Sequence, residues 1–328
     1  MRALLSGRFL AVAVGLLLIC GLGGCAAPQG KATSALTHRA AATVPPAPWW
    51  RSAGDPLLTR LIEHGLDADT RLRDEAAALT RAEAHARTWH YRVATWFGAI
   101  VGRPPENFDA AALHLARARQ RKAEAIALSY VEIRRLQAVL TLRQDFQAQF
   151  SDDARIAQWR REAGLVSAVD GGLAATLIGV NADALHATDA SLATARATLA
   201  RQTGVAAPEL EQQLGAAATL PDPTIGTDVE TTATAADRAA LDSTAARATA
   251  LHAVQHGAER TAADARTAYQ LGSGDFATVY VAETALLQVR DATIAARAAH
   301  AVAAIRLRAD AALAAIGRTP GSEERSGD

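Results

Sequence analysis

The feature that most restricts how this chain can fold is a run from Asp109 to Ala163 that contains neither proline nor glycine. Apolar and aromatic residues recur along it at helical spacing: Ala112, Leu115, Ile126, Tyr130, Ile133, Leu136, Leu140 and Phe146. Such a run predicts one uninterrupted helix, because proline and glycine are the residues that most often end one. At 1.5 Å per residue it would be about 80 Å long, far beyond an average globular helix. We therefore expect a few long helices.

Glycine and proline divide the rest of the chain into further helical segments. A helix should begin at Pro56, with Asp55 as its N-cap, and its apolar stripe continues towards Arg92. Three more helices are expected: one over 169–203, ended by Gly204 and Pro208, one from near 235 to the glycine at 272, and one over 276–316. The predicted fold class is all-α, with long antiparallel helices and little or no β structure.

The two halves of this helical region are alike. In each, a long helix meets a glycine-bearing segment, 164–167 in one half and 269–276 in the other, and a second helix leads away. This predicts two coiled-coil hairpins in an internal duplication, with repeat 1 over about 55–207 and repeat 2 over about 233–320. Together they would form one elongated domain, 55–320, before a disordered tail, 321–328. Chance repetition in an alanine-rich chain is the competing explanation.

The N-terminal segment has the pattern of an export signal. Arg2 and Arg8 precede an apolar stretch, Phe9–Cys20, that is too short to span a bilayer as a helix. The sequence Leu22-Gly23-Gly24-Cys25 then resembles the lipobox of bacterial lipoproteins, which implies cleavage before Cys25 and acylation of its thiol. An ordinary secretory signal with an incidental cysteine is the alternative.

The segment after the signal is predicted to be a tether. Residues 1–24 would be removed as the signal peptide, and residues 25–54 would form a lipidated tether rich in Ala, Thr and Pro. Several acyl chains on one residue would make a firm anchor. Ala26 follows the cysteine in place of the aspartate that resembles an inner-membrane retention signal, so sorting to the outer membrane is favoured.

Composition argues against several classes of function. The 34 Lys and Arg residues balance 34 Asp and Glu, and only Lys31 and Lys122 are lysines, so no basic run offers itself to nucleic acid. The two cysteines are Cys20, inside the signal, and Cys25, which would carry lipid. The mature chain therefore has no thiol for a disulfide or for catalysis.

One spacing resembles a metal site. His252 and His256 lie four residues apart with Glu259 beyond them, but a third ligand cannot be named. No Gly-x-Ser-x-Gly turn occurs. We expect no enzyme activity, no cofactor and no metal.

Four features in order along the chain resemble the outer-membrane efflux factors, the lipoprotein channel components of tripartite RND-type pumps. They are the lipobox Cys25; Trp49-Trp50 with Asp55-Pro56-Leu57 and Leu61-Ile62; Arg160 to Ser167; and Tyr269 to Asp275 followed by Val279, Ala282-Glu283 and Leu286-Leu287. The resemblance implies a homotrimer whose long helices form a periplasmic tunnel. It also implies two β-hairpins per subunit that close a barrel in the outer membrane.

Those hairpins have no clear counterpart in the sequence. A membrane strand needs about ten residues of alternating character. The first expected place holds only Trp89–Asn107, which could form one short pair of strands or a helix, and the second holds only His256-Gly257-Ala258 between helical segments. The chain is therefore predicted to be a shortened member that lacks most of its barrel strands and is attached through Cys25.

The resemblance places partner binding at the two hairpin tips. Family members there contact a periplasmic adaptor (membrane fusion) protein and, through it, an inner-membrane pump. The matching residues are Gly164, Leu165, Val166, Ser167 and Asp170 in the first tip, and Gly272, Ser273, Gly274, Asp275 and Thr278 in the second. Helix capping by Ser167 and Asp275 would explain much of the same pattern, so both interpretations stay open.

The sequence thus favours an efflux factor-like lipoprotein, a periplasmic helical channel or docking component that acts by binding and not by catalysis. It would be lipid-anchored in the outer membrane and would face the periplasm. Two alternatives remain: a structural envelope lipoprotein whose coiled coil is a spacer, and a degenerate efflux factor without transport activity.

Overall fold

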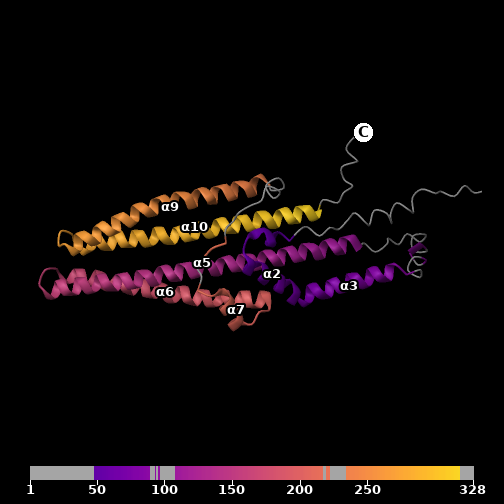
Figure 1. Ribbon diagram of the computed structural model, residues 1–328, viewed down its shortest axis with the longest axis horizontal. Coiled ribbons are helices and arrows are strands. Elements are labelled where there is room, and N and C mark those ends of the chain that lie inside the picture. The colour runs from indigo at the N-terminus through magenta and orange to yellow at the C-terminus, as the bar shows by residue number, and fades with distance from the viewer. Residues whose placement is uncertain are drawn as a thin grey trace, which may run out of the picture. The chain divides into compact units, whose positions relative to one another are not determined.

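The regular elements of the described chain are all helices. The computed structural model describes residues 48–88, 93, 95–96, 108–216, 219–221 and 234–317 (Figure 1). The elements are a 3₁₀ helix η2 (Trp49–Ala53) and seven α-helices: α2 (Pro56–Ala68), α3 (Thr70–Ala86), α5 (Phe108–Glu162), α6 (Ala168–Thr203), α7 (Ala207–Leu214), α9 (Ala235–Gln270) and α10 (Phe276–Gly317). The predicted all-α class is confirmed.

Helix α5 is the predicted long helix, and it runs for 55 residues. It contacts α2, α3, α6 and α10, so its buried side chains lie on several faces and not in one stripe. The prediction of its bounds was correct to one residue at each end, because the local signals that end a helix are absent between Asp109 and Ala163.

Two antiparallel hairpins form the bulk of the described chain. Helices α5 and α6 pack along each other, α9 and α10 do the same, and α10 also packs on α5 (Figure 1). Each hairpin has a short turn, which we call its tip: residues 163–167 in the first hairpin and 271–275 in the second. The two predicted coiled-coil hairpins are therefore present.

The apolar interior has two parts. The base core lies around η2, α2, α7 and the ends of the long helices remote from the tips; it includes Trp49, Leu58, Ile62, Ile126, Tyr130, Leu192, Leu199, Leu210 and Ile305. The tip-half core lies between the halves of the four long helices that lead to the tips; it includes Phe146, Phe150, Leu177, Tyr269, Phe276, Val279 and Leu286.

Partly buried polar contacts hold the segment that enters the base core. Asp55 caps α2 by accepting hydrogen bonds from the backbone nitrogens of Leu57 and Leu58 at 2.9 and 3.0 Å. Its second oxygen accepts a hydrogen bond from the Tyr130 hydroxyl at 2.7 Å. Burial, more than these partners, raises the pKa of Tyr130 to about 12. Asp55 therefore joins the start of α2 to the middle of α5.

The first predicted helix is two helices, so its expected continuation towards Arg92 was wrong. The break falls at Asp69, whose side chain caps α3 and lies 3.0 Å from Lys122 Nζ on α5. The Lys122 hydrogen bond holds the pKa of Asp69 below its ordinary value. Gly65 does not interrupt α2: a Cβ there would lie 2.5 Å from Ile126 Cδ1, so the glycine permits close packing on α5.

Helix α7 was not predicted. Gly204 and Pro208 were expected to end the helical region, and Gly204 does end α6 with a φ of 75°. Pro208, however, lies in the first turn of α7, where proline is well tolerated. Leu210 and Leu214 of α7 are buried in the base core.

Several expectations concern residues outside the described part of the chain. They include the signal peptide, Cys25, most of 89–107 and the tail 321–328. At the other expected place for strands, α9 continues without interruption through His256-Gly257-Ala258. None of the helices in the described segments combines the length and the apolar character that a bilayer crossing requires.

Candidate partner-binding tips

The first tip is closed by a helix-ending turn built around Gly164. The backbone nitrogens of Gly164 and Leu165 donate to the carbonyl oxygens of Arg161 and Arg160 at 2.9 and 2.8 Å. This pair of bonds is the Schellman motif, which requires a left-handed residue, and Gly164 has a φ of 73°. The motif reverses the chain and pairs the carbonyl oxygens of Arg160 and Arg161 in the last turn of α5.

The second tip repeats this turn. The nitrogens of Gly272 and Ser273 donate to the carbonyl oxygens of Tyr269 and Ala268 at 3.0 and 2.9 Å, and Gly272 has a φ of 81°. Gly274 adds a bond from its nitrogen to the carbonyl oxygen of Ala268 at 3.1 Å. The two predicted tips therefore share their backbone geometry.

An N-cap stands three residues after each left-handed glycine. Ser167 Oγ accepts from the Val169 nitrogen at 3.2 Å and starts α6. Asp275 Oδ1 accepts from the nitrogen and the hydroxyl of Thr278 at 2.8 and 2.7 Å and starts α10. These hydrogen bonds from Thr278 lower the pKa of Asp275. The capping roles considered for Ser167 and Asp275 are thus real, and they leave the outer surface of both tips available.

The surface of the tips is partly apolar. Leu165 is 68% exposed, Val169 66% and Leu271 79%, although leucine and valine are usually buried. Trp159, in the last turn of α5, is also exposed. Val166, in contrast, packs on the tip-half core. Exposed apolar groups in one region are the common mark of a docking surface.

The two tips are linked by one arginine. Arg160 of α5 donates from Nη1 to the backbone carbonyl oxygen of Tyr269 on α9, and its guanidinium lies 4.7 Å from the centre of the Tyr269 ring. Tyr269 also packs edge-on against Phe276 at the start of α10, with ring centres 5.3 Å apart. Burial raises the pKa of the Tyr269 hydroxyl above its ordinary value. This contact places the two tips side by side.

Eight of the ten predicted tip residues lie in the two turns, which are joined through Arg160; Asp170 and Thr278 lie in the first turns of α6 and α10. Asp170 lies in the first turn of α6, with Oδ1 3.5 Å from Ser167 Oγ. Val169 and Leu271 were not among the predicted tip residues, because each lies at the end of a helix, where an apolar residue is expected to belong to the core. Their positions were the available signal: Leu271 directly precedes the turn glycine Gly272, and Val169 follows the capping Ser167 by two residues.

The two histidines considered as metal ligands contact each other and Glu259 instead. The rings of His252 and His256 stack edge to face with centres 4.8 Å apart, and His256 Nδ1 lies 3.5 Å from Glu259. Glu259 accepts from Gln255 and Arg290, which lower its pKa. Across the described residues, no group of three His, Cys, Asp or Glu side chains could hold a metal ion.

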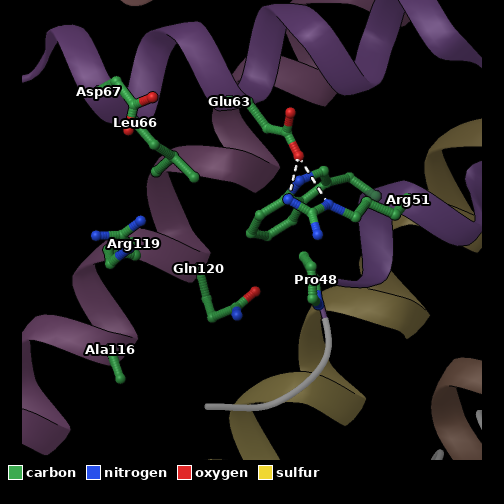
Figure 2. A pocket seen from close by; sticks show the side chains of 9 residues that line it. Pro48, Arg51, Glu63, Leu66, Asp67, Ala116, Arg119 and Gln120 are labelled. Carbon is green, nitrogen blue, oxygen red and sulfur yellow. Dashed lines mark hydrogen bonds and ion pairs between the residues drawn. The ribbon is translucent and has the colours of Figure 1, made fainter.

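One pocket of about 610 Å³ lies near the start of the described chain, between η2, α2 and α5. Figure 2 shows the Arg51–Glu63 ion pair, 2.7 Å long, at its edge, with Arg119 and Gln120 on the side of α5. Side chains of both signs line it, together with Pro48 and Leu66.

Solved structures with a similar fold are outer-membrane proteins. The outer-membrane channel OprN has a TM-score of 0.63 at 14% identity, covering 81% of this chain and 91% of that chain. The outer membrane protein VceC from Vibrio cholerae has a TM-score of 0.61 at 16% identity, covering 82% and 98%. CusC, known from structures on folding and transmembrane channel formation, has a TM-score of 0.60 at 13% identity, covering 79% and 92%.

Comparison by sequence adds nothing to this likeness. No family model matches the chain, and no curated protein matches it. The likeness to outer-membrane channel proteins is thus a likeness of fold.

Proposed function

We propose that the protein is a lipid-anchored, periplasm-facing channel or docking component of a tripartite efflux system, and that it works by binding a periplasmic adaptor. The observation that carries the proposal is the pair of matching tips, each with an apolar side chain next to its turn glycine. The fold shared with outer-membrane channel proteins supports it. Catalysis has no part in this function.

The chemistry of the tips suits a helical partner. Leu165 directly follows the left-handed Gly164 and Leu271 directly precedes the left-handed Gly272, and both side chains extend into solvent. Burying such side chains contributes about 1.5–3 kcal/mol each relative to exposure. The exposed charges of Arg161 and Glu162 at the rim would orient the partner more than they strengthen its binding.

The anchor is a separate part of the proposal. Acyl chains on Cys25 would hold the protein at the outer membrane, at about 0.8 kcal/mol per buried CH₂. Replacing Cys25 by Ser should release the protein into the soluble periplasmic fraction, and mass spectrometry should show loss of the acyl mass. A variant that remains in the membrane fraction would contradict lipid anchoring.

Site-specific cross-linking tests the tips. Single cysteines at Ser167 and Ser273 place a reactive group on each tip, and both positions are exposed. Ser191→Cys is the matched control, since Ser191 is an exposed serine of α6 about 36 Å along the helix from Ser167. With a short bifunctional reagent in whole cells, both tip variants should yield an adduct with an adaptor, and the control should not.

Two outcomes would count against the proposal. Equal adducts at all three positions would show non-selective proximity. No adduct at either tip, with helical circular dichroism intact, would favour the spacer lipoprotein, and normal drug export with altered envelope integrity after gene deletion would support that alternative. Low helicity of the purified protein would favour a degenerate factor.

A further inference from the structure

The interface between the hairpins contains a buried carboxyl group in the tip half. Glu283 of α10 is fully buried, at 0% exposure. Its Oε1 lies 2.8 Å from Arg266 Nε on α9, an ion pair within the second hairpin. Neither carboxyl oxygen has a well-aligned hydrogen-bond partner within the described chain, and among the described residues Arg266 is the one cation in salt-bridge contact with Glu283.

A second buried carboxyl group faces the same arginine from the other hairpin. Asp153 of α5 is 6% exposed, and its Oδ2 is buried without a hydrogen-bond partner among the described residues. Asp153 and Glu283 repel each other, and each is attracted by Arg266. Two buried carboxyl groups, one from each hairpin, therefore share a single cation.

The other charged groups nearby do not restore the balance. Arg290 of α10 also acts on Glu283, but its Nη2 lies 2.8 Å from Glu259 Oε1 on α9, which compensates it. Asp152 of α5 acts on Asp153, and it is exposed and paired with Arg155 on its own helix. No charged group of α6 is among those that act on either carboxyl.

The nearest neutral polar group does not complete the site either. Gln149, one turn before Asp153 on α5, favours the charged form of Glu283 through its side-chain amide, but its buried Nε2 lacks the geometry of a full hydrogen bond and it carries no charge. If both carboxyl groups were ionised, the interface would bury one uncompensated negative charge. Such a charge is costly away from water, and a carboxyl group avoids the cost by taking up a proton.

We propose that Asp153 and Glu283 form a buried proton-binding site between the hairpins, which holds one proton on the pair at neutral pH. A protonated carboxyl group can donate a hydrogen bond, which two carboxylates cannot do for each other. Burial is the largest cause that raises the pKa of each group, and Arg266 opposes it. The proton belongs to the pair and not to one residue.

The sign of the pH effect follows from this site. In the unfolded chain both carboxyl groups are ionised at neutral pH, so folding takes up a proton. The contribution of the pair to stability is lost as the pH rises through the folded pKa. It is regained as the pH falls, and is complete below the unfolded values. This inference does not depend on the proposed function.

The test combines infrared spectroscopy with denaturant unfolding of the full chain. At pH 7 the wild-type protein should show the carbonyl stretch of a protonated carboxylic acid, and Asp153→Asn and Glu283→Gln should each remove it. Between pH 8 and pH 6 the wild-type folding equilibrium constant should rise by up to about tenfold per pH unit relative to either variant. Asp152→Asn is the matched control, and it should keep both the band and the pH slope.

The results that would overturn the proposal are equally specific. Absence of a protonated-acid band in the wild-type protein at pH 7 would show that both groups are ionised; this measurement needs no variant to fold. A pH slope unchanged in both Asp153→Asn and Glu283→Gln would show that the proton, if present, lies elsewhere. A band lost from Asp152→Asn would move the site to the helix surface.

Discussion

The base core and the tip-half core join the same long helices by different means. In the base core, large side chains such as Leu58 and Ile62 are fully buried, and the close approach of α2 to α5 at Gly65 leaves no room for even one more carbon. In the tip half, the two hairpins meet across aromatic rings and also across Asp153, Glu283 and Arg266. Apolar packing is insensitive to pH, whereas a buried carboxyl pair is not.

This contrast indicates which contacts between the helices have a strength independent of pH and which depend on protonation. Removing one partner of a buried ionic group lowers folding stability much more than replacing the whole group by apolar residues does. The tip half therefore has an interface whose strength depends on protonation, next to the surface proposed to bind a partner. The base has no such dependence in its apolar contacts.

The largest expected effect is in the base core. Ile62→Ala removes a fully buried side chain and should lower the free energy of unfolding by about 2–5 kcal/mol at every pH between 5 and 8. Urea unfolding followed by circular dichroism measures it. Leu271→Ala, at an exposed tip position, is the control and should stay within about 0.5 kcal/mol. Equal losses of stability in the two variants would show that buried Ile62 contributes no more to stability than an exposed tip residue.

The next effect is in the tip half and should depend on pH. Arg266→Gln leaves Glu283 and Asp153 buried without their cation, so it should cost up to about 3 kcal/mol at pH 8 and less at pH 5, where the carboxyl groups take up protons. Urea unfolding at both pH values measures the difference. Arg155→Gln breaks only the exposed pair with Asp152 and should change stability little. A loss for Arg266→Gln that is independent of pH would argue against the charge explanation.

The turn glycines should respond equally in the two tips. Gly164→Ala and Gly272→Ala each force a side chain into the left-handed region, at a cost of about 1–2 kcal/mol. Thermal unfolding compares them. Gly172 lies inside α6 with open space around its Cβ position, so Gly172→Ala should instead stabilise the protein by about 0.5–1 kcal/mol. Very different losses at the two tips would contradict their equivalence.

The smallest effect concerns a helix cap. Ser167→Ala removes the oxygen that accepts from Val169 and should lower stability by roughly 0.5–1 kcal/mol, whereas Ser167→Asn should retain it. Hydrogen exchange of the first amides of α6 would localise the change to the tip. If Ser167→Ala reduced adaptor cross-linking while the first turn of α6 stayed protected, Ser167 would act in binding as well as in capping.

Much of the helical structure could be predicted from the sequence. The bounds of α5, α6, α9 and α10 lie close to the predicted ones because their signals are local: Gly164, Gly204 and Gly272 end helices, and Ser167 and Asp275 begin them. The tips were found for the same reason. Each of these residues acts on backbone groups within a few positions of itself.

The break between α2 and α3 could not be predicted in this way. Asp69 continues the pattern of a helix, and what favours a cap there is a bond to Lys122 on another helix. Helix α7 was missed because Leu210 and Leu214 become core residues only through contact with distant segments. The same holds for the bond between Arg160 and Tyr269.

That this chain forms long helices, and where they turn, could be predicted from local sequence, because helix formation and capping depend on groups adjacent along the chain. Which helix faces are buried and which charges meet depends on how the helices pack. In the sequence, three charged residues have the pattern of ordinary surface positions on three helices: Asp153, Arg266 and Glu283. Packing then removes water from around Asp153 and Glu283. Burial is a property of the assembled helices, and so are the pKa values and contacts that follow from it.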